Sequence, residues 1–198
     1  WVVGKIENEA QKHLKKFVVM LGGEHSITTG LVRALKKRHF DFSVLQLDAH
    51  ADSRDRYKGS PYNHASVMAR VKEICPVVQV GVRSVAEEEA LSIHWENIFL
   101  AKDIYDHDDW IKEAVNKLRE KVYITIDMDV FETSLMPSTG TPEPGGLGWY
   151  QVLKFLKQVI EKKKILAFDV VELCPNKNNK SPDFLAAKLI YKLLSYLY

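Results

Sequence analysis

Three short apolar runs in this sequence, at residues 17–21, 42–47 and 122–126, are each followed by side chains that can bind a metal ion. The six candidates are His25, Asp48, His50, Asp52, Asp127 and Asp129. After two of the runs these side chains occupy alternate positions, and alternate residues of a strand project from one face. Because open parallel sheets bind ligands at the carboxyl ends of their strands, the three motifs predict one shared metal-binding site.

The charges of these ligands indicate how many ions the site holds. Four carboxylates around one divalent ion would leave a net negative charge, whereas four around two such ions sum to neutral. Oxygen-rich ligation with two imidazoles and no thiolate favours Mn²⁺ or a similar hard ion over structural zinc. Two ions about 3.5–4 Å apart lower the pKa of a shared water and act as Lewis acids. The predicted chemistry is therefore hydrolysis.

The elements that must position these residues alternate between strand and helix. We expect strands at 17–21, 42–47, 77–81, 97–101, 121–126 and 165–171. We expect helices at 5–15, 26–37, 64–74, 86–94, 108–120, 149–161 and 181–197. Ser26 is the expected N-cap of the second helix, and Ser181-Pro182 begins the last one. This alternation, without internal repeats, predicts an α/β domain with a largely parallel sheet.

Two loops have compositions that suggest a role at the site. Residues 53–63 form a polar loop that is long for a compact domain, so we interpret it as a candidate substrate loop. Residues 137–146 contain three prolines and three glycines. Such a composition excludes a helix or strand interior and stiffens a defined loop.

The composition is that of an ordinary globular domain, with 198 residues, 46% of them hydrophobic and 27% charged. A formal net charge of +2 gives no electrostatic reason to expect binding to nucleic acid or a membrane surface. No apolar run approaches the roughly 20 residues that span a bilayer. Cys75 and Cys174 form no paired motif, so we expect a reduced, cytoplasmic protein with both thiols buried. Trp1 stands where an initiator Met would be, so we expect residues upstream.

The three metal-binding motifs resemble, in the same order, the signature motifs of the ureohydrolases, the arginase and agmatinase family. They read Gly22-Gly23-Glu24-His25-Ser26, Asp48-Ala49-His50-Ala51-Asp52 and Ile126-Asp127-Met128-Asp129-Val130. The resemblance extends over nearly the whole chain, including residues 139–146 and 169–172. It implies a three-layer αβα fold, two manganese ions and hydrolysis of a guanidinium to urea and an amine. We expect residues 1–198 to form a single ureohydrolase domain that lacks the family's N-terminal strand and loops.

The resemblance also implies roles for individual residues. One ion would be held by His25, Asp48, Asp52 and Asp127, and the other by Asp48, His50, Asp127 and Asp129, so that Asp48 and Asp127 bridge the two ions. Glu172 matches the guanidinium-binding glutamate and His64 the proton-shuttling histidine. The candidate catalytic residues are therefore His64, Asp129 and Glu172, and the candidate substrate-binding residues are Glu172, His64 and Thr141. The family's trimers and hexamers imply a homo-oligomer.

General chemistry agrees with the roles of Glu172 and His64. A guanidinium is cationic near neutral pH and its carbon is a poor electrophile, so a carboxylate acceptor must orient it for attack. The departing amine leaves only after protonation, and a nearby histidine can supply that proton.

The residues after the second motif bear on the substrate. Ser53-Arg54-Asp55-Arg56-Tyr57 resembles agmatinases more than arginases, and Asp55 would repel the α-carboxylate of arginine. Agmatine is therefore the expected substrate, with Arg54 and Arg56 pointing outward into solvent. If either arginine pointed inward, the pocket would suit guanidinobutyrate or formimidoylglutamate. Two other classes remain open: another metal-dependent amidohydrolase, such as a one-zinc deacetylase, and a non-catalytic homologue that keeps the fold.

Overall fold

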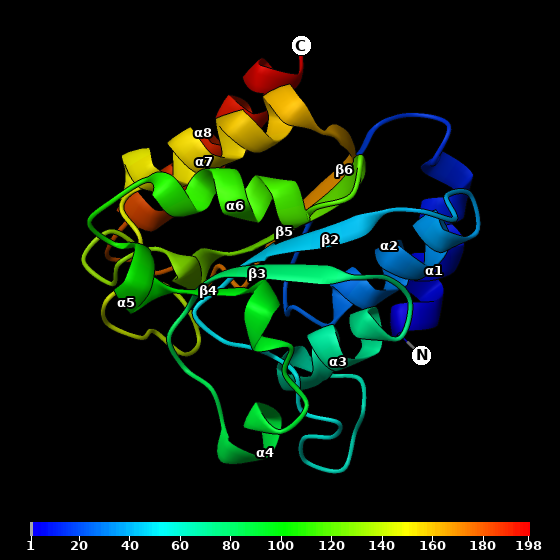
Figure 1. Cartoon of the computed structure of the whole chain (residues 1–198), viewed down its shortest axis with the longest axis horizontal. Coiled ribbons are helices and arrows are strands. Elements are labelled where there is room, and N and C mark those ends of the chain that lie inside the picture. Colours follow the sequence, from blue (N-terminus) through cyan, green and yellow to red (C-terminus); the bar gives the residue numbers. More distant parts are fainter. Residues whose placement is uncertain (1) are drawn as a thin grey trace.

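The computed structural model describes residues 2–198, which form a six-stranded sheet flanked by helices (Figure 1). The strands are β1 (Val18–Leu21), β2 (Ser43–Leu47), β3 (Val77–Val82), β4 (Ile98–Leu100), β5 (Lys121–Asp127) and β6 (Lys164–Val171). Their spatial order is β1-β6-β5-β2-β3-β4, and every neighbouring pair is parallel. The predicted α/β fold is confirmed, and these six strands are parallel throughout.

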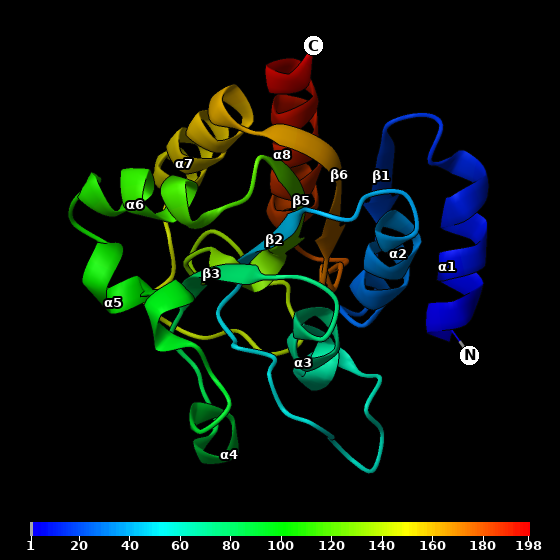
Figure 2. The same ribbon diagram turned by 45° about the vertical axis from the view of Figure 1, so that its right-hand side comes forward.

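Helices cover both faces of the sheet, which gives the three αβα layers expected (Figure 2). One face carries α1 (Val2–His13), α2 (Ile27–Lys36) and α3 (Val67–Lys72). The other carries α6 (Asp109–Lys117), α7 (Trp149–Lys162) and α8 (Ser181–Leu197). The shorter helices are α4 (Glu87–Ala90), α5 (Ala101–Ile104) and the 3-10 turns η1 (His64–Ser66), η2 (Trp95–Asn97) and η3 (Met128–Val130).

Alternate side chains of the central strands enter two different cores. Leu45 and Ile124 pack on the α6–α8 side, whereas Val44 and Tyr123 pack on the α1–α3 side. Every residue of β2 is buried. Full burial of a large apolar side chain contributes about 1.5–3 kcal/mol, so a one-residue slip that exchanged the two faces would be strongly disfavoured. This two-sided packing fixes the register at the strand ends.

Gly22 lets the turn after β1 approach the end of β6. A Cβ atom at this position would lie 2.6 Å from Val171 Cγ1 and 2.6 Å from Ile27 Cδ1, and both distances are shorter than a van der Waals contact allows. The Gly22 amide instead donates a hydrogen bond to the Val170 carbonyl at 2.9 Å. The absence of a side chain therefore allows the next residues, including His25, to fold over the sheet edge.

The expected helix at 86–94 is wrong beyond its first turn, because α4 ends at Ala90. Leu91, which would continue the helix, is 93% exposed. Helices in proteins depend on burying an apolar face, and this segment has little to bury. Similarly, the expected strand at 97–101 ends at Leu100, and Ala101 begins α5.

Two expectations about single residues are also wrong. The Ser26 side chain does not cap α2, because its backbone already has helical angles and its hydroxyl donates to the Glu24 carboxylate. Cys75 is buried as expected, but Cys174 is exposed in the loop after β6. Within residues 2–198, none of the helices combines the length and apolar character needed to cross a membrane.

Candidate metal centre

The register of the sheet brings the three predicted motifs to one edge. Leu47 of β2 lies beside Ile126 of β5, so the next residues, Asp48 and Asp127, emerge next to each other. Asp127 in turn lies beside Val171 of β6. The segment after β1, which carries His25, reaches this edge through the pairing of β1 with β6.

All six predicted metal ligands lie together. Two groups of ligand atoms within 4.8 Å of one another are formed, one by His25, Asp48 and Asp127 and the other by Asp48, His50 and Asp129. Asp48 is common to both groups, as expected of a bridging ligand, whereas Asp127 appears in the first group alone. The sixth residue, Asp52, belongs with the first group because its Oδ2 lies 3.2 Å from His25 Nδ1.

The atom that best tests whether cations fit here is Nδ1 of His25. It is fully buried and has no hydrogen-bond partner. Carboxylate oxygens of Asp48, Asp52 and Asp127 nevertheless converge on it at 3.1, 3.2 and 3.3 Å. A lone pair facing three anionic oxygens is unfavourable unless a cation, either a proton or a metal ion, stands between them.

The pKa values of the cluster show the same unbalanced negative charge. Burial would lower the pKa of His25, yet the carboxylates of Asp127, Asp48 and Asp52 outweigh burial and raise it well above its ordinary value. Burial and the charges of Asp48 and Asp129 raise the pKa of Asp127 well above its ordinary value. Two divalent cations with a preference for oxygen ligands fit this donor set.

The carboxylates of the candidate ligands are held in place by neighbouring donors. The backbone N–H groups of His50, Ala49 and Asp129 donate, respectively, to Asp48 at 2.6 Å, to Asp129 at 2.9 Å and to Asp127 at 2.8 Å. In addition, Gln46 Nε2 donates to Asp48 Oδ2 at 2.6 Å, and Gln79 donates to Gln46 Oε1 at 2.5 Å. Neither glutamine was predicted from the sequence as a site residue, although amides inside otherwise apolar strands were an available signal.

Two residues of the site have backbone angles that L-amino acids rarely adopt. Asp52 has a φ of 49° and Glu172 a φ of 64°. Such strain concentrates at functional sites. The Asp52 turn is held by Glu89, which was not predicted from the sequence as a site residue. Glu89 is 5% exposed and accepts from the Ser53 and Ala86 amides at 2.6 and 2.8 Å.

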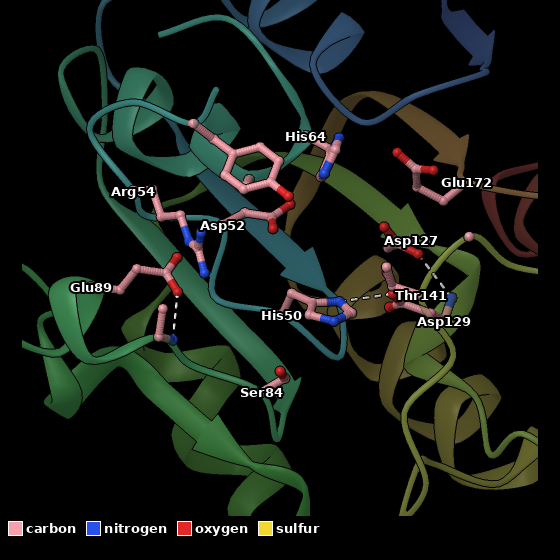
Figure 3. Close-up of a pocket in the computed structure, with 14 residues that line it drawn as sticks. His50, Asp52, Arg54, His64, Ser84, Glu89, Asp127, Asp129, Thr141 and Glu172 are labelled. Carbon is pink, nitrogen blue, oxygen red and sulfur yellow. Dashed lines mark hydrogen bonds and ion pairs between the residues drawn. The ribbon is translucent and has the colours of Figure 1, made fainter. Parts of the chain in front are cut away.

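The cluster opens into a pocket that contains the other predicted site residues. His50, Asp52, Asp127 and Asp129 lie at its base, and Glu172, His64 and Thr141 line its wall (Figure 3). One Glu172 oxygen accepts from the His25 backbone amide at 2.6 Å. Because this bond fixes one end of the carboxylate, the second oxygen is available to the pocket. Burial raises the pKa of Glu172.

His64 is positioned by Glu24, whose role the sequence did not reveal. The Glu24 carboxylate accepts from the His64 backbone amide and lies 3.1 Å from His64 Nδ1. The His64 ring also meets the edge of Tyr57, with ring centroids 5.5 Å apart. The imidazole is thus oriented from two sides while its side chain remains 47% exposed.

Two expectations about the 53–63 loop need correction. Asp55 does not line the pocket: it is 76% exposed and its Oδ1 accepts from Arg70 at 2.6 Å. Arg54, expected outside, lines the pocket instead (Figure 3). Its Nε lies 3.5 Å from Glu88 and its guanidinium carbon 5.1 Å from the Tyr57 ring centre. Because Arg54 points inward, its guanidinium loses part of its hydration, and the contacts with Glu88 and Tyr57 compensate for that loss.

Arg83 links the candidate metal site to the loop that carries Thr141. Its guanidinium, half-buried, donates to backbone carbonyls of three segments of the chain. These acceptors are Asp129 at 2.7 Å, Glu143 at 2.7 Å, Pro144 at 3.0 Å and Gly81 at 3.2 Å. The planar fork of an arginine is suited to such divergent acceptors. The 140–146 loop is therefore fixed relative to Asp129.

Comparison with known proteins agrees with this geometry. Residues 2–195 match the family model described as the arginase family. The chain is 46% identical to an N(1)-aminopropylagmatine ureohydrolase of Synechocystis sp., over 91% of this chain and 61% of the relative. It is 40% identical to an agmatinase of Pyrococcus horikoshii, over 89% of this chain and 61% of that protein. The chain thus spans about three-fifths of the length of these relatives.

Among solved structures, the agmatine ureohydrolase of Thermoplasma volcanium superimposes with a TM-score of 0.88 at 34% identity, covering 99% of this chain and 68% of that one. The sequence motifs, the fold and these similarities all lead to one assignment: the chain belongs to the arginase family.

Proposed function

We propose that this chain is a binuclear manganese hydrolase that cleaves the guanidino group of agmatine, or of an N-substituted agmatine, to urea and an amine. The observation that carries the proposal is the pair of ligand groups sharing Asp48 at a pocket that Glu172 also lines, with one Glu172 oxygen held by the His25 amide. Relatives named agmatinase and N(1)-aminopropylagmatine ureohydrolase support this substrate class.

The proposed metal ligands are those predicted from the sequence: His25, Asp48, Asp52 and Asp127 for one ion, and Asp48, His50, Asp127 and Asp129 for the other. Two divalent ions held there would supply a water nucleophile at neutral pH and Lewis-acid stabilisation of developing negative charge. The carboxylate oxygens bonded to backbone amides are held rigidly, so their partner oxygens are directed inward.

Glu172 orients the substrate. Its carboxylate is anchored by the His25 amide, so a guanidinium binding to its other oxygen would be placed directly beside the metal ligand His25. Guanidinium donors and carboxylate acceptors form short, directional, charge-assisted hydrogen bonds. Holding a poor electrophile in the right geometry beside the nucleophile lowers the barrier to attack.

His64 delivers the proton that the departing amine needs. Its exposed position lets it exchange protons with solvent, and the Glu24 carboxylate beside Nδ1 favours a ring with Nε2 directed away from Glu24. A histidine with this access can transfer a proton between solvent and the pocket.

A second candidate substrate class is supported by Arg54. A guanidinium on the pocket wall attracts a carboxylate at the substrate's far end and repels an ammonium. Guanidinobutyrate and formimidoylglutamate carry such a carboxylate, and arginine carries both charges. Glu88, which pairs with Arg54, partly offsets this preference.

The test is kcat/KM of the Mn²⁺-loaded protein for agmatine, N(1)-aminopropylagmatine, arginine, guanidinobutyrate and formimidoylglutamate. We expect agmatine or its aminopropyl derivative to be preferred. A preference for a carboxylate-bearing substrate would overturn this choice, and Arg54→Gln should then abolish that preference while the matched variant Arg56→Gln, on the same loop but outside the pocket, should not. Turnover of none of them would support the non-catalytic homologue.

We further propose that the protein is cytoplasmic and forms a homo-oligomer. Light scattering of the purified protein tests the homo-oligomer, and a monomeric mass would contradict it.

A further inference from the structure

A chain of buried polar side chains runs from His25 into the layer between the sheet and α2. His25 Nε2 lies 2.9 Å from Thr125 Oγ1, which lies 3.3 Å from Thr28 Oγ1. Thr28 Oγ1 donates to Asp169 Oδ2 at 2.6 Å. The Tyr123 hydroxyl donates to the same Asp169 oxygen. All five side chains are 0% exposed, so no bulk water replaces any of these contacts.

The direction of each hydrogen bond follows from the number of protons available. Asp169 Oδ2 accepts a hydrogen bond from Thr28, so the single hydroxyl proton of Thr28 is donated to Asp169. The Thr28 hydroxyl can therefore only accept a hydrogen bond from Thr125, so Thr125 donates its single hydroxyl proton to Thr28. That leaves the Thr125 oxygen as an acceptor, and the proton between it and His25 must come from Nε2.

A neutral histidine with its proton on Nε2 carries its lone pair on Nδ1. Nδ1 is the atom on which the carboxylates of Asp48, Asp52 and Asp127 converge. The hydrogen-bonded chain and the metal cluster thus act on opposite nitrogens of one ring.

We propose that Asp169, acting through Thr28 and Thr125, is a positioning residue that holds His25 in the tautomer whose Nδ1 binds the first metal ion. This role rests on the metal site of the proposed function, but it concerns residues that bind neither metal nor substrate. It also gives a reason for a carboxylate that lies far from solvent and outside the pocket.

A purely structural alternative is that Asp169 only satisfies the Thr28 and Tyr123 hydroxyls. The two roles differ in what Thr125 does, because Thr125 lies between Asp169 and the imidazole. Thr125→Val keeps the shape of the side chain and removes the link, whereas Thr125→Ser restores the hydroxyl. Thr29→Val is a matched control, since Thr29 is the next residue of α2, is 1% exposed and takes no part in this chain.

The experiment measures Mn²⁺ binding by calorimetry and the count of bound ions. Thr125→Val should lower the affinity for one of the two ions about 10- to 100-fold, which is the usual effect of removing a hydrogen-bond partner of a metal-binding histidine. The affinity for the other ion should stay within about threefold of the wild-type value. Thr125→Ser and Thr29→Val should bind both ions as the wild type does. If Thr125→Val does not fold, Thr28→Val breaks the same chain one step further from His25 and should weaken the same ion.

Nuclear magnetic resonance of ¹⁵N-histidine-labelled, Zn²⁺-loaded protein supplies a readout that packing alone would not change. We expect one slowly exchanging Nε2–H proton, assigned to His25, in the wild type and Thr29→Val, and its rapid exchange in Thr125→Val. Equal Mn²⁺ affinities for Thr125→Val and Thr29→Val, or a proton on His25 Nδ1 in the loaded protein, would overturn the proposed role alone. A wild-type protein that binds no metal would overturn it together with the metal site.

Discussion

Replacing Glu172 with glutamine tests the most specific feature of the proposed active site. One Glu172 oxygen accepts from the His25 amide at 2.6 Å, and Glu172 lines the pocket, so we assign its other oxygen to the substrate guanidinium. A glutamine has a single acceptor oxygen. The His25 amide would donate to that oxygen, so the side-chain NH₂ would be left for the substrate. A guanidinium also offers only donors, so the two groups could not form a hydrogen bond.

The magnitude follows from what is lost. A charge-assisted hydrogen bond contributes about 1.5–3 kcal/mol, which corresponds to roughly 13- to 160-fold in kcat/KM. Because a donor facing donors is worse than an absent contact, the lower value is a minimum. Glu172→Gln should therefore lose at least about 13-fold in kcat/KM for agmatine, while its Mn²⁺ content and melting temperature stay close to those of the wild type.

The assay is urea release by Mn²⁺-loaded protein over a range of agmatine concentrations. Glu113→Gln, the same change on the exposed side of α6, controls for the loss of one negative charge. A Glu172→Gln variant within about threefold of Glu113→Gln, with both variants folded and loaded, would refute the assigned role.

Four further predictions follow from the same geometry. Asp127→Ala should lower the bound Mn²⁺ per chain, measured by elemental analysis, without lowering the melting temperature of metal-free protein, because burial and neighbouring negative charges already disfavour its ionised form; one tightly bound ion per active wild-type chain would contradict the two-ion site. His64→Ala should lose less activity than Glu172→Gln and be partly rescued by added imidazole; equal, unrescued losses would show that the two roles are misassigned. Arg83→Lys should destabilise the protein by about 1.5–3 kcal/mol in thermal melts, since lysine cannot span carbonyls that the guanidinium reaches at 2.7 Å in two different segments; an unchanged melting temperature would refute this. Burial lowers the pKa of Lys72 from 10.5 to about 8, so the unfolded chain binds more protons between these pH values and stability should rise with pH across that window; Lys72→Met should lack this rise, and an identical pH dependence of the two melting temperatures would contradict it.

The sequence was sufficient to single out the six candidate metal ligands that the fold brings together, because each motif is local. Asp48, His50 and Asp52 follow a strand at alternate positions, and this spacing was enough to single them out as one set. The strands were equally evident, since short apolar runs between polar turns have few other conformations available. Alternation of strand and helix then predicted a parallel sheet, whose carboxyl edge collects all three motifs.

Local patterns were less reliable where packing decides the structure. The acidic segment 86–94 reads as a helix, but with Leu91 exposed it forms a single turn, and the Glu89 carboxylate turns back to bind the Ser53 amide. The 53–63 loop shows the same dependence. Its sequence does not indicate that Arg54 points inward while Asp55 pairs with Arg70, because that choice depends on what α3 and Glu88 present to the loop.

The sequence by itself therefore determined which side chains could bind metal and the order of the elements that carry them, because both are set by spacing within a few residues. Only the tertiary structure decided which atoms of those side chains are free. Asp169 reaches Thr28 across 141 positions of sequence, and His25 reaches Glu172 across 147. Such contacts arise when helices pack on a sheet of fixed register, so the tautomer of His25 and the orientation of Glu172 are consequences of the packed fold rather than of any local motif.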